Sequence, residues 1–368
     1  MPHKRFASDD DNVPAFTKSK KQRLRVLESD LKEPVKQKQK NEDYTVGWIC
    51  AIATEYVAAQ SFLDEKHEQP EHVSPNDNND YTLGRIGKHY VVIAVLPDHE
   101  YGTSSAAGVA RDMLHSFPSI RIGLMVGIGG GAPNPRHDIR LGDIVVSTLH
   151  GREGGVLQYD FGKAIQGQEF QVTGYLNQPP TLLRTAVTGL KAEYERNGHQ
   201  LKKAIANILK NNRRLRKKYR QPNSDTDKLY RSEITHCSNP NTDCAIVCGS
   251  DPSRLVSRQE RGEGGDDPMV HHGLIASANC LMRDALLRDK YSNENNVLCF
   301  EMESAGPINH FPCLVIRGIC DYSDTHKNDL WQGYATMTAA TYAKDLLNRI
   351  PASKVESEKR IVDMLSSG

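Results

Sequence analysis

The chain has 368 residues, of which 25% are charged, and a formal net charge of +1. A nearly neutral chain has no global attraction for nucleic acid or for a membrane surface, so we predict neither as a partner. No apolar stretch is long enough to span a bilayer, and the first residues lack the apolar core of a secretory signal. The length suits one large α/β domain with appended segments. We expect the eight cysteines to be reduced thiols of an intracellular protein.

Residues 1–43 show almost no apolar periodicity and are predicted to form a disordered basic tail. The cationic cluster in this tail could act as a nuclear localisation signal, whereas the simpler interpretation is a solvated tail. We therefore expect a cytoplasmic protein, with a nuclear location as the alternative. Residues 351–368 are predicted to be a polar C-terminal tail. The basic cluster comprises Lys18, Lys20, Lys21, Arg23 and Arg25.

Strand-like and helix-like segments alternate after the basic tail. A buried strand comes first, and a helix opens at about Thr54. Two strands with hairpin-like spacing follow at 81–84 and 89–96. The next predicted helix has the hydroxyl of Thr103 or Ser104 as its N-cap.

A further buried strand at 122–126 runs into a glycine-rich stretch at 127–131. Glycines after a strand let backbone N–H groups approach a ligand without an intervening side chain. The glycine spacing lacks the dinucleotide-binding fingerprint, and no Gly-Lys-Ser/Thr follows. Neither an NAD site nor a P-loop is therefore supported.

A helical pattern covers about 179–219, and its second half is strongly basic. We predict a basic helical insertion at about 195–245. A nucleic-acid surface is conceivable, but few aromatic residues accompany the cations. A solvated helix face is therefore the favoured interpretation.

Cysteine and histidine residues gather at the end of this insertion. Cys237, Cys244 and Cys248, with His236 nearby, could ligate zinc. Their spacing lacks the pair-and-pair pattern of common zinc sites. Buried thiols are the favoured interpretation, and we predict no metal.

Two apolar runs near the C-terminus each end in acidic side chains. Val297–Phe300 precedes Glu303, and Cys313–Ile316 precedes Asp321. Both runs have the length and β-branched content of buried strands. Ligands bind at the carboxyl ends of strands in open α/β sheets, so these carboxylates predict a site. Glu301 would point to the opposite face of a continuing strand and is left out.

Six stretches within residues 44–350 resemble the purine and uridine phosphorylase superfamily, and most closely its fungal nucleoside phosphorylase-like domains. Their order and spacing are specific together, although each alone is weak. The resemblance implies a three-layer α/β/α sandwich around a mixed, partly closed sheet, and cleavage of the N-glycosidic bond of a nucleoside. The stretches are AIATE (51–55), VGIGGGAP (126–133), LGDIVVS (141–147), HHGLIASAN (271–279), FEMESAG (300–306) and VIRGICDYSD (315–324).

Breaking a ribose–base bond places positive charge on the sugar and negative charge on the base, so the departing base must be protonated. The resemblance implies that Asp321 is this general acid, donating to N7 of a purine, with a helix N-cap as its structural alternative. Partial burial at a strand end would favour its protonated form. Glu303 would accept hydrogen bonds from the ribose 2′ and 3′ hydroxyls. Met302 would pack on the sugar, or simply in the core.

Phosphorylases of this superfamily bind phosphate through arginines in the loop after the first strand and before the glycine-rich turn. This chain has Glu55 in the first loop and Met125 before the turn, and neither offers phosphate a charge-assisted hydrogen bond. In hydrolytic relatives a glutamate matching Glu55 activates water, and an arginine matching Arg317 pairs with that glutamate and orients it. We therefore expect a purine nucleoside N-ribohydrolase, with Gly129 and Gly130 near the water and the base. The alternative role for Glu55 is a first-turn glutamate favoured by the helix dipole.

The chain departs from these hydrolytic relatives where Asn279, Leu281 and Ile128 replace an aspartate, an aromatic residue and a serine. Leu281 becomes the candidate contact for the base, and the choice among purine nucleosides and their 5′-modified forms stays open. Arg121 and Arg136 remain candidate phosphate ligands of a purine nucleoside phosphorylase, which is the alternative enzyme.

The proposed chemistry needs no cofactor and no metal, and its partners are a purine nucleoside and water. The resemblance also implies a homo-oligomer, because many family members complete the pocket with a neighbour's residues. A hypothesis from another class is a non-catalytic nucleoside-sensing or scaffold module.

Overall fold

The computed structural model describes residues 39–236, 244–262, 266–326 and 329–366. The basic cluster of the N-terminal tail and Cys237 lie outside these residues. The strands are β1 (Val46–Cys50), β2 (Glu65–Lys66), β3 (Asp80–Ile86), β4 (His89–Val95), β5 (Ile122–Gly131), β6 (Ile144–Ser147), β7 (Val156–Gln158), β8 (Gly162–Lys163), β9 (Gln171–Val172), β10 (Val270–Ser277), β11 (Val297–Glu301) and β12 (Cys313–Asp321). The helices are α2 (Ala53–Ser61), α3 (Thr103–Ser116), α4 (Thr181–Asn197), α5 (Leu201–Asn211), α6 (Arg216–Tyr219), α7 (Cys244–Val247), α8 (Ala285–Asn295), α9 (Gln332–Arg349), α10 (Ala352–Ser357) and α11 (Ile361–Ser366). Short 3₁₀ turns lie at Asn41–Asp43, Ser224–Thr226 and Pro252–Arg254.

One mixed sheet forms the centre of the domain, with the strand order β11-β10-β6-β12-β5-β1-β4-β3-β2. Strand β11 also pairs antiparallel with the end of β5, where Phe300 faces Gly130. This second pairing closes β5, β12, β6, β10 and β11 into a ring. The prediction of a mixed, partly closed sheet is confirmed.

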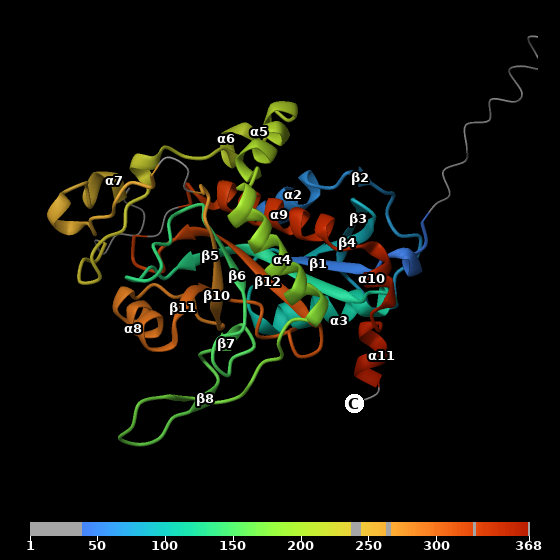
Figure 1. Cartoon of the computed structure of the whole chain (residues 1–368). Helices are drawn as coiled ribbons and strands as arrows, with labels where there is room; N and C mark the ends of the chain where they lie inside the picture. Colours follow the sequence, from blue (N-terminus) through green and yellow to red (C-terminus); the bar gives the residue numbers. More distant parts are fainter. Residues whose placement is uncertain (1–38, 237–243, 263–265, 327–328, 367–368) are drawn as a thin grey trace, which may run out of the picture. The chain divides into compact units, whose positions relative to one another are not determined.

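Helices cover both faces of the sheet (Figure 1). Helix α9 packs against β5 and β12, and α3 packs against β1 and β4. The approach of α9 is close because both partners are small: a Cβ atom on Gly318 would lie 1.9 Å from the carbonyl oxygen of Ala335. The strands under these helices are mostly apolar, as expected for strands buried on both faces, and the exceptions are His89 at the start of β4 and Arg317 and Asp321 of β12.

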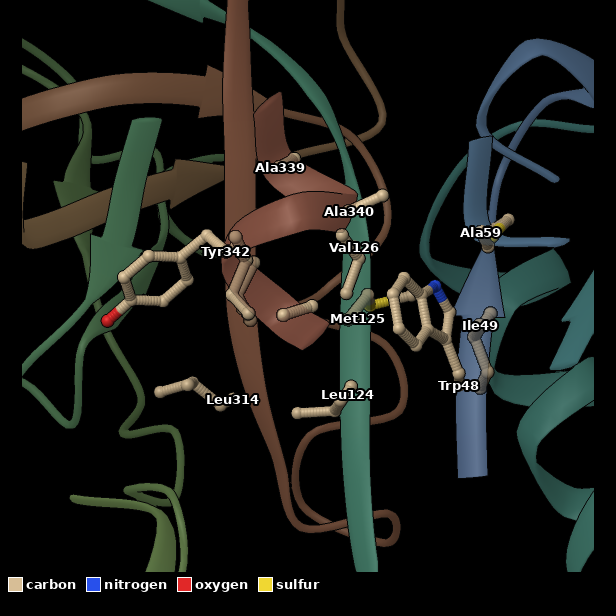
Figure 2. Packing of buried hydrophobic residues seen from close by; sticks show 14 of the residues in the cluster. Trp48, Ile49, Ala59, Leu124, Met125, Val126, Leu314, Ala339, Ala340 and Tyr342 are labelled. Atoms are coloured by element: carbon tan, nitrogen blue, oxygen red, sulfur yellow. The ribbon is translucent and has the colours of Figure 1, made fainter. Parts of the chain in front are cut away.

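Met125, one of the residues used to argue against a phosphorylase, lies in the core between β1 and β5. Met125 is the register partner of Ile49 and is 2% exposed. Figure 2 shows its side chain among the buried apolar residues, which include Trp48. Met125 therefore packs in the core.

Helix α4 leads into the predicted basic insertion, whose first part folds as α5 and α6. Leu201, Ile205 and Leu209 recur at every fourth residue of α5 and are buried, and α5 packs on α9. The cations of α5 lie on the opposite, exposed side. The apolar stripe therefore fixes the helix, and the charges stay in solvent.

Two local predictions are wrong. The expected polar tail after residue 350 contains α10 and α11, because Val355 and Ile361 are fully buried. The N-cap of α3 is Gly102, and the Thr103 hydroxyl instead donates to the side chain of Asn279. Leu281, the candidate contact for the base, precedes α8 and its side chain is 45% exposed.

Within the described ranges, none of the helices combines the length and apolar character that crossing a membrane requires.

Candidate active site

A cavity of about 350 Å³ lies at the carboxyl ends of β1, β5, β11 and β12. This is the edge at which open α/β sheets bind ligands, and the volume is in the range of small-molecule sites. Of the eight predicted site residues, all but Arg317 line the cavity. Those that line it are Glu55, Gly129, Gly130, Leu281, Met302, Glu303 and Asp321.

Glu55 lies in the first turn of α2 and is 3% exposed. Its carboxylate accepts hydrogen bonds from the backbone N–H groups of Ala51 at 2.6 Å, Ile52 at 3.2 Å and Ile128 at 2.8 Å. Burial raises the pKa of Glu55, while nearby Arg317 and these N–H donors lower it. The hydrogen bond from the Ile52 N–H also caps α2. Glu55 therefore also has the structural role of a first-turn glutamate that stabilises the helix. A buried, oriented carboxyl with a raised pKa is suited to accept a proton.

Arg317 of β12 is fully buried behind the cavity wall and does not have the predicted arrangement. It forms an ion pair with Glu301, and its Nη2 lies 3.6 Å from Glu303 Oε2. It also acts on Glu55 electrostatically, and a Cβ atom on Gly127 would lie within 2.5 Å of both Glu55 Oε1 and Arg317 Nη1. The predicted pairing of Arg317 with Glu55 is therefore part of a larger charge cluster. In this cluster one guanidinium interacts with three carboxyl groups, those of Glu55, Glu301 and Glu303.

Glu301 is the main residue that sequence reasoning missed. It ends β11, and because residues two apart on a strand share a face, alternation puts it on the side of Glu303. Its carboxylate lines the cavity, pairs with Arg317 and accepts hydrogen bonds from the backbone N–H groups of Glu303 and Ser304. The short polar turn after the strand was the signal that could have identified it.

Glu303 is buried at the cavity wall beside these charges. Burial raises its pKa to about 7, while Arg317 lowers it and the neighbouring Glu301 and Glu55 raise it. Three carboxyl groups share one guanidinium, so full ionisation would leave unbalanced negative charge in a buried place. The cluster is therefore suited to hold a proton near neutral pH.

Asp321 ends β12 and lines the same cavity. Its Oδ1 accepts from the Ser323 N–H at 2.9 Å, and its Oδ2 lies 3.4 Å from the Cys320 thiol. The carboxyl thus stabilises a turn, and it does not cap a helix. Ser323 has a left-handed backbone, with φ of 54°, and also lines the cavity. Its buried hydroxyl has no hydrogen-bond partner among the described residues, so a ligand could provide one.

The glycines of β5 leave the room that the site needs. A Cβ atom on Gly130 would lie 2.2 Å from Ser323 Oγ and 2.6 Å from Asp321 Oδ1. Any larger residue would displace the candidate acid. Gly129 is adjacent, and its Cβ would meet the carbonyl oxygen of Phe300 at 3.0 Å.

The rest of the wall is apolar or neutral. Met302 and Leu281 line it, and the side chain of Leu281 is partly exposed. Tyr101 and Gln332 also line it and were not predicted, because no local pattern marks them. Arg121 and Arg136, the candidate phosphate ligands, do not line the cavity. Arg121 instead donates to the carbonyl oxygen of Glu358.

A second group of reactive side chains lies outside this cavity. Histidine and thiol ligand atoms from His236, Cys244 and Cys248 all lie within 4.8 Å of one another. None of the three lines the cavity.

No model of a known protein family matches the chain. A nucleotide-binding leucine-rich repeat (NLR)-like protein of Hyaloscypha variabilis is 44% identical over 308 residues, which are 83% of this chain and 29% of that protein. The ATP nucleosidase Cap17 of Escherichia coli is 32% identical over 85 residues, which are 22% of this chain and 17% of Cap17. The chain therefore spans less than a third of the length of either relative.

Solved structures resemble nearly the whole domain. The 5′-methylthioadenosine/S-adenosylhomocysteine nucleosidase of Helicobacter pylori matches with a TM-score of 0.53 at 14% identity, over 84% of this chain and 99% of the enzyme. S-adenosylhomocysteine nucleosidase of Streptococcus pyogenes matches with 0.51 at 16%, over 84% and 98%. Futalosine hydrolase of Helicobacter pylori matches with 0.50 at 15%, over 83% and 98%. The chain therefore has the nucleoside phosphorylase and nucleosidase fold, as its sequence motifs predicted.

Proposed function

We propose that this chain is a purine nucleoside N-ribohydrolase of the purine and uridine phosphorylase superfamily. The observation that carries the proposal is the placement of Glu55, Glu303 and Asp321 on the wall of one cavity. The fold shared with solved nucleosidases supports it. The chemistry follows from what each carboxyl group can do there.

Asp321 donates its proton to N7 of the purine as the glycosidic bond breaks, and the bonding electrons leave with the base. Glu303 accepts hydrogen bonds from the ribose hydroxyls and holds the sugar while positive charge develops on it. Glu55 takes a proton from water, and the oxygen of that water bonds to the anomeric carbon. The products are the free purine and ribose. Asp321 regains its proton from solvent, and Glu55 returns the one that it accepted.

Hydrolysis is favoured over phosphorolysis by the charges at the wall. No lysine or arginine is among the described residues that line the cavity, whereas acidic side chains approach it from β11, β12 and α2. The buried Arg317 is already paired with Glu301. A dianionic phosphate would therefore meet repulsion without a compensating charge-assisted bond.

A purine nucleoside 5′-phosphate is the second candidate substrate, because a basic segment adjoins the cavity. Lys218 of α6 donates to the hydroxyl of Thr54 at 2.7 Å, and Thr54 is the neighbour of Glu55 in α2. The same turn of α6 packs against the start of α9, where a Cβ atom on Gly333 would lie 2.0 Å from the Lys218 carbonyl oxygen. Gln332, which directly precedes Gly333 in the chain, lines the cavity. The basic segment that contains Lys218 therefore lies close to one side of the acidic cavity.

The charged residues of this basic segment are all positive. Residues 196–224 contain ten lysines and arginines and no acidic residue. Phosphates on the 5′ carbon could lie against it while the sugar stays at Glu303. The name of one partial relative, an ATP nucleosidase, agrees with a phosphorylated substrate.

The test is base release from adenosine, inosine, guanosine and their 5′-phosphates, with and without inorganic phosphate, and with identification of the sugar product. We expect free purine and an unphosphorylated anomeric carbon without added phosphate. A sugar 1-phosphate formed only with phosphate would show a phosphorylase. Tight ligand binding with no base release in any reaction would instead support the sensing or scaffold module. The matched control is Asp321→Asn, which keeps the shape of the side chain and removes its acid.

A further inference from the structure

The insertion and the loop after Asp321 meet at the His236, Cys244 and Cys248 group. Cys244 and Cys248 are separated by one helical turn, with the Cys248 N–H bonded to the Cys244 carbonyl oxygen at 2.9 Å. Both thiols therefore lie on one side of that turn. His236 comes from the preceding segment, and its Nδ1 lies 3.0 Å from Cys248 Sγ. Three ligand atoms that suit a soft or borderline metal are thus brought within 4.8 Å of one another.

A buried histidine from a distant part of the chain faces the same place. His326 is 7% exposed and stacks on Tyr230 with ring centroids 3.9 Å apart. Its ring centroid is 6.0 Å from that of His236. Neither of its ring nitrogens has a hydrogen-bond partner among the described residues, although Asp324 lies 3.5 Å from Nδ1. An imidazole buried without a hydrogen bond is costly, and a metal would offset that cost.

Thiolate and imidazole ligands at such distances are those of structural zinc sites, which are tetrahedral and take four ligands. Coordination to zinc would remove the proton of each thiol, because a metal-bound cysteine is a thiolate.

We propose that His236 Nδ1, Cys244 Sγ and Cys248 Sγ bind one zinc ion, with the fourth coordination position on the side of His326. Binding transfers one proton from each thiol to solvent and forms two Zn–S bonds and one Zn–N bond. The sequence marks His236, Cys244 and Cys248 as possible zinc ligands, but no spacing connects them with His326 in a distant part of the chain.

Zinc binding would stabilise the loop that follows the candidate acid, Asp321. The His236 N–H donates to the Thr325 hydroxyl at 2.8 Å, four residues after Asp321. In the same loop the Tyr322 hydroxyl bonds to Asp227 of the insertion. The metal would add a further link between the insertion and this loop. The site does not depend on the nucleosidase proposal, because the loop is built whether or not the cavity is catalytic.

The test is the metal content of the whole chain, purified without chelator or metal-affinity tag and dialysed against metal-free buffer. We expect about one zinc per chain in the wild type by elemental mass spectrometry, and nearly none in Cys244→Ser and Cys248→Ser. Cys280→Ser is the matched control, since that thiol is exposed and far along the chain from the site, and its zinc content should equal that of the wild type.

Cobalt substitution keeps the test decisive if the cysteine variants fail to fold. The wild type loaded with Co²⁺ should show thiolate-to-cobalt charge-transfer absorption and the visible bands of tetrahedral cobalt. Wild type without bound zinc and without these bands overturns the proposal. An intact mass showing a Cys244–Cys248 disulfide in the freshly purified protein overturns it as well.

Discussion

Replacing Glu303 by glutamine tests the charge cluster at the cavity most directly. Glu303 is 6% exposed and shares Arg317 with Glu301 and Glu55. Glutamine has nearly the same shape as the protonated side chain and cannot ionise. The variant therefore removes one titration and leaves the packing nearly unchanged.

The expected size follows from the pKa. Burial raises the pKa of Glu303 from 4.5 to about 7, and a group with a raised folded pKa stabilises the protein at low pH. This contribution is fully present below the unfolded pKa and is lost as the pH rises through the folded one. At about 1.4 kcal/mol per pKa unit, the loss between pH 4.5 and pH 8 is about 3 kcal/mol. The wild type should lose that much unfolding free energy relative to the Glu303→Gln variant.

The assay is equilibrium urea unfolding of both ligand-free proteins at several pH values from 4.5 to 8, after reversibility is checked. Groups outside the cluster titrate alike in the two proteins, so the difference between their unfolding free energies reports on the charge cluster that contains Glu303. We expect the wild type to be favoured most at the acid end. A difference that stays constant over this range, or grows with pH, would refute the proposed charge cluster.

Asp321→Asn should reduce base release by on the order of 10²–10⁴-fold with little change in ligand affinity, which isothermal titration and product assays can separate. Gly130→Ala should impair activity similarly, since the added Cβ would lie 2.6 Å from Asp321 Oδ1; normal activity would show that the carboxyl is not needed where it stands. Lys218→Ala should lower kcat/KM for a purine nucleoside 5′-phosphate about tenfold more than for the nucleoside, with Lys203→Ala as the exposed control, and equal effects would reject the phosphate contact. Removing metal with a chelator should speed amide hydrogen exchange at 322–326, and unchanged exchange would show that zinc does not hold that loop.

The sequence by itself determined the strand ends and the acidic residues that follow them. Short apolar runs before Glu303 and Asp321 predict buried strands, and the carboxyl ends of such strands meet at one edge of a sheet. Glu55 was identified through the resemblance to hydrolytic relatives, which have a glutamate at the matching position. These three do line one cavity, and their catalytic roles stay predictions.

The tertiary structure alone decided the partners of these groups. Arg317 pairs with Glu301 because β11 and β12 lie in one closed ring of strands, and the sequence contains no signal for ring closure. Glu301 was excluded as pointing to the opposite face, although residues two apart on a strand share a face, so that alternation puts Glu301 on the side of Glu303.

The same limit applies to the segments outside the site. Polar composition predicted a tail after residue 350, but two apolar side chains, Val355 and Ile361, find room in the core and fix helices there. His326 reaches the His236 group across about 90 residues of chain. Local pattern reports which face of a segment is apolar and where a strand ends. Which distant residues come into contact depends on packing of the whole chain, and no spacing in the sequence records it.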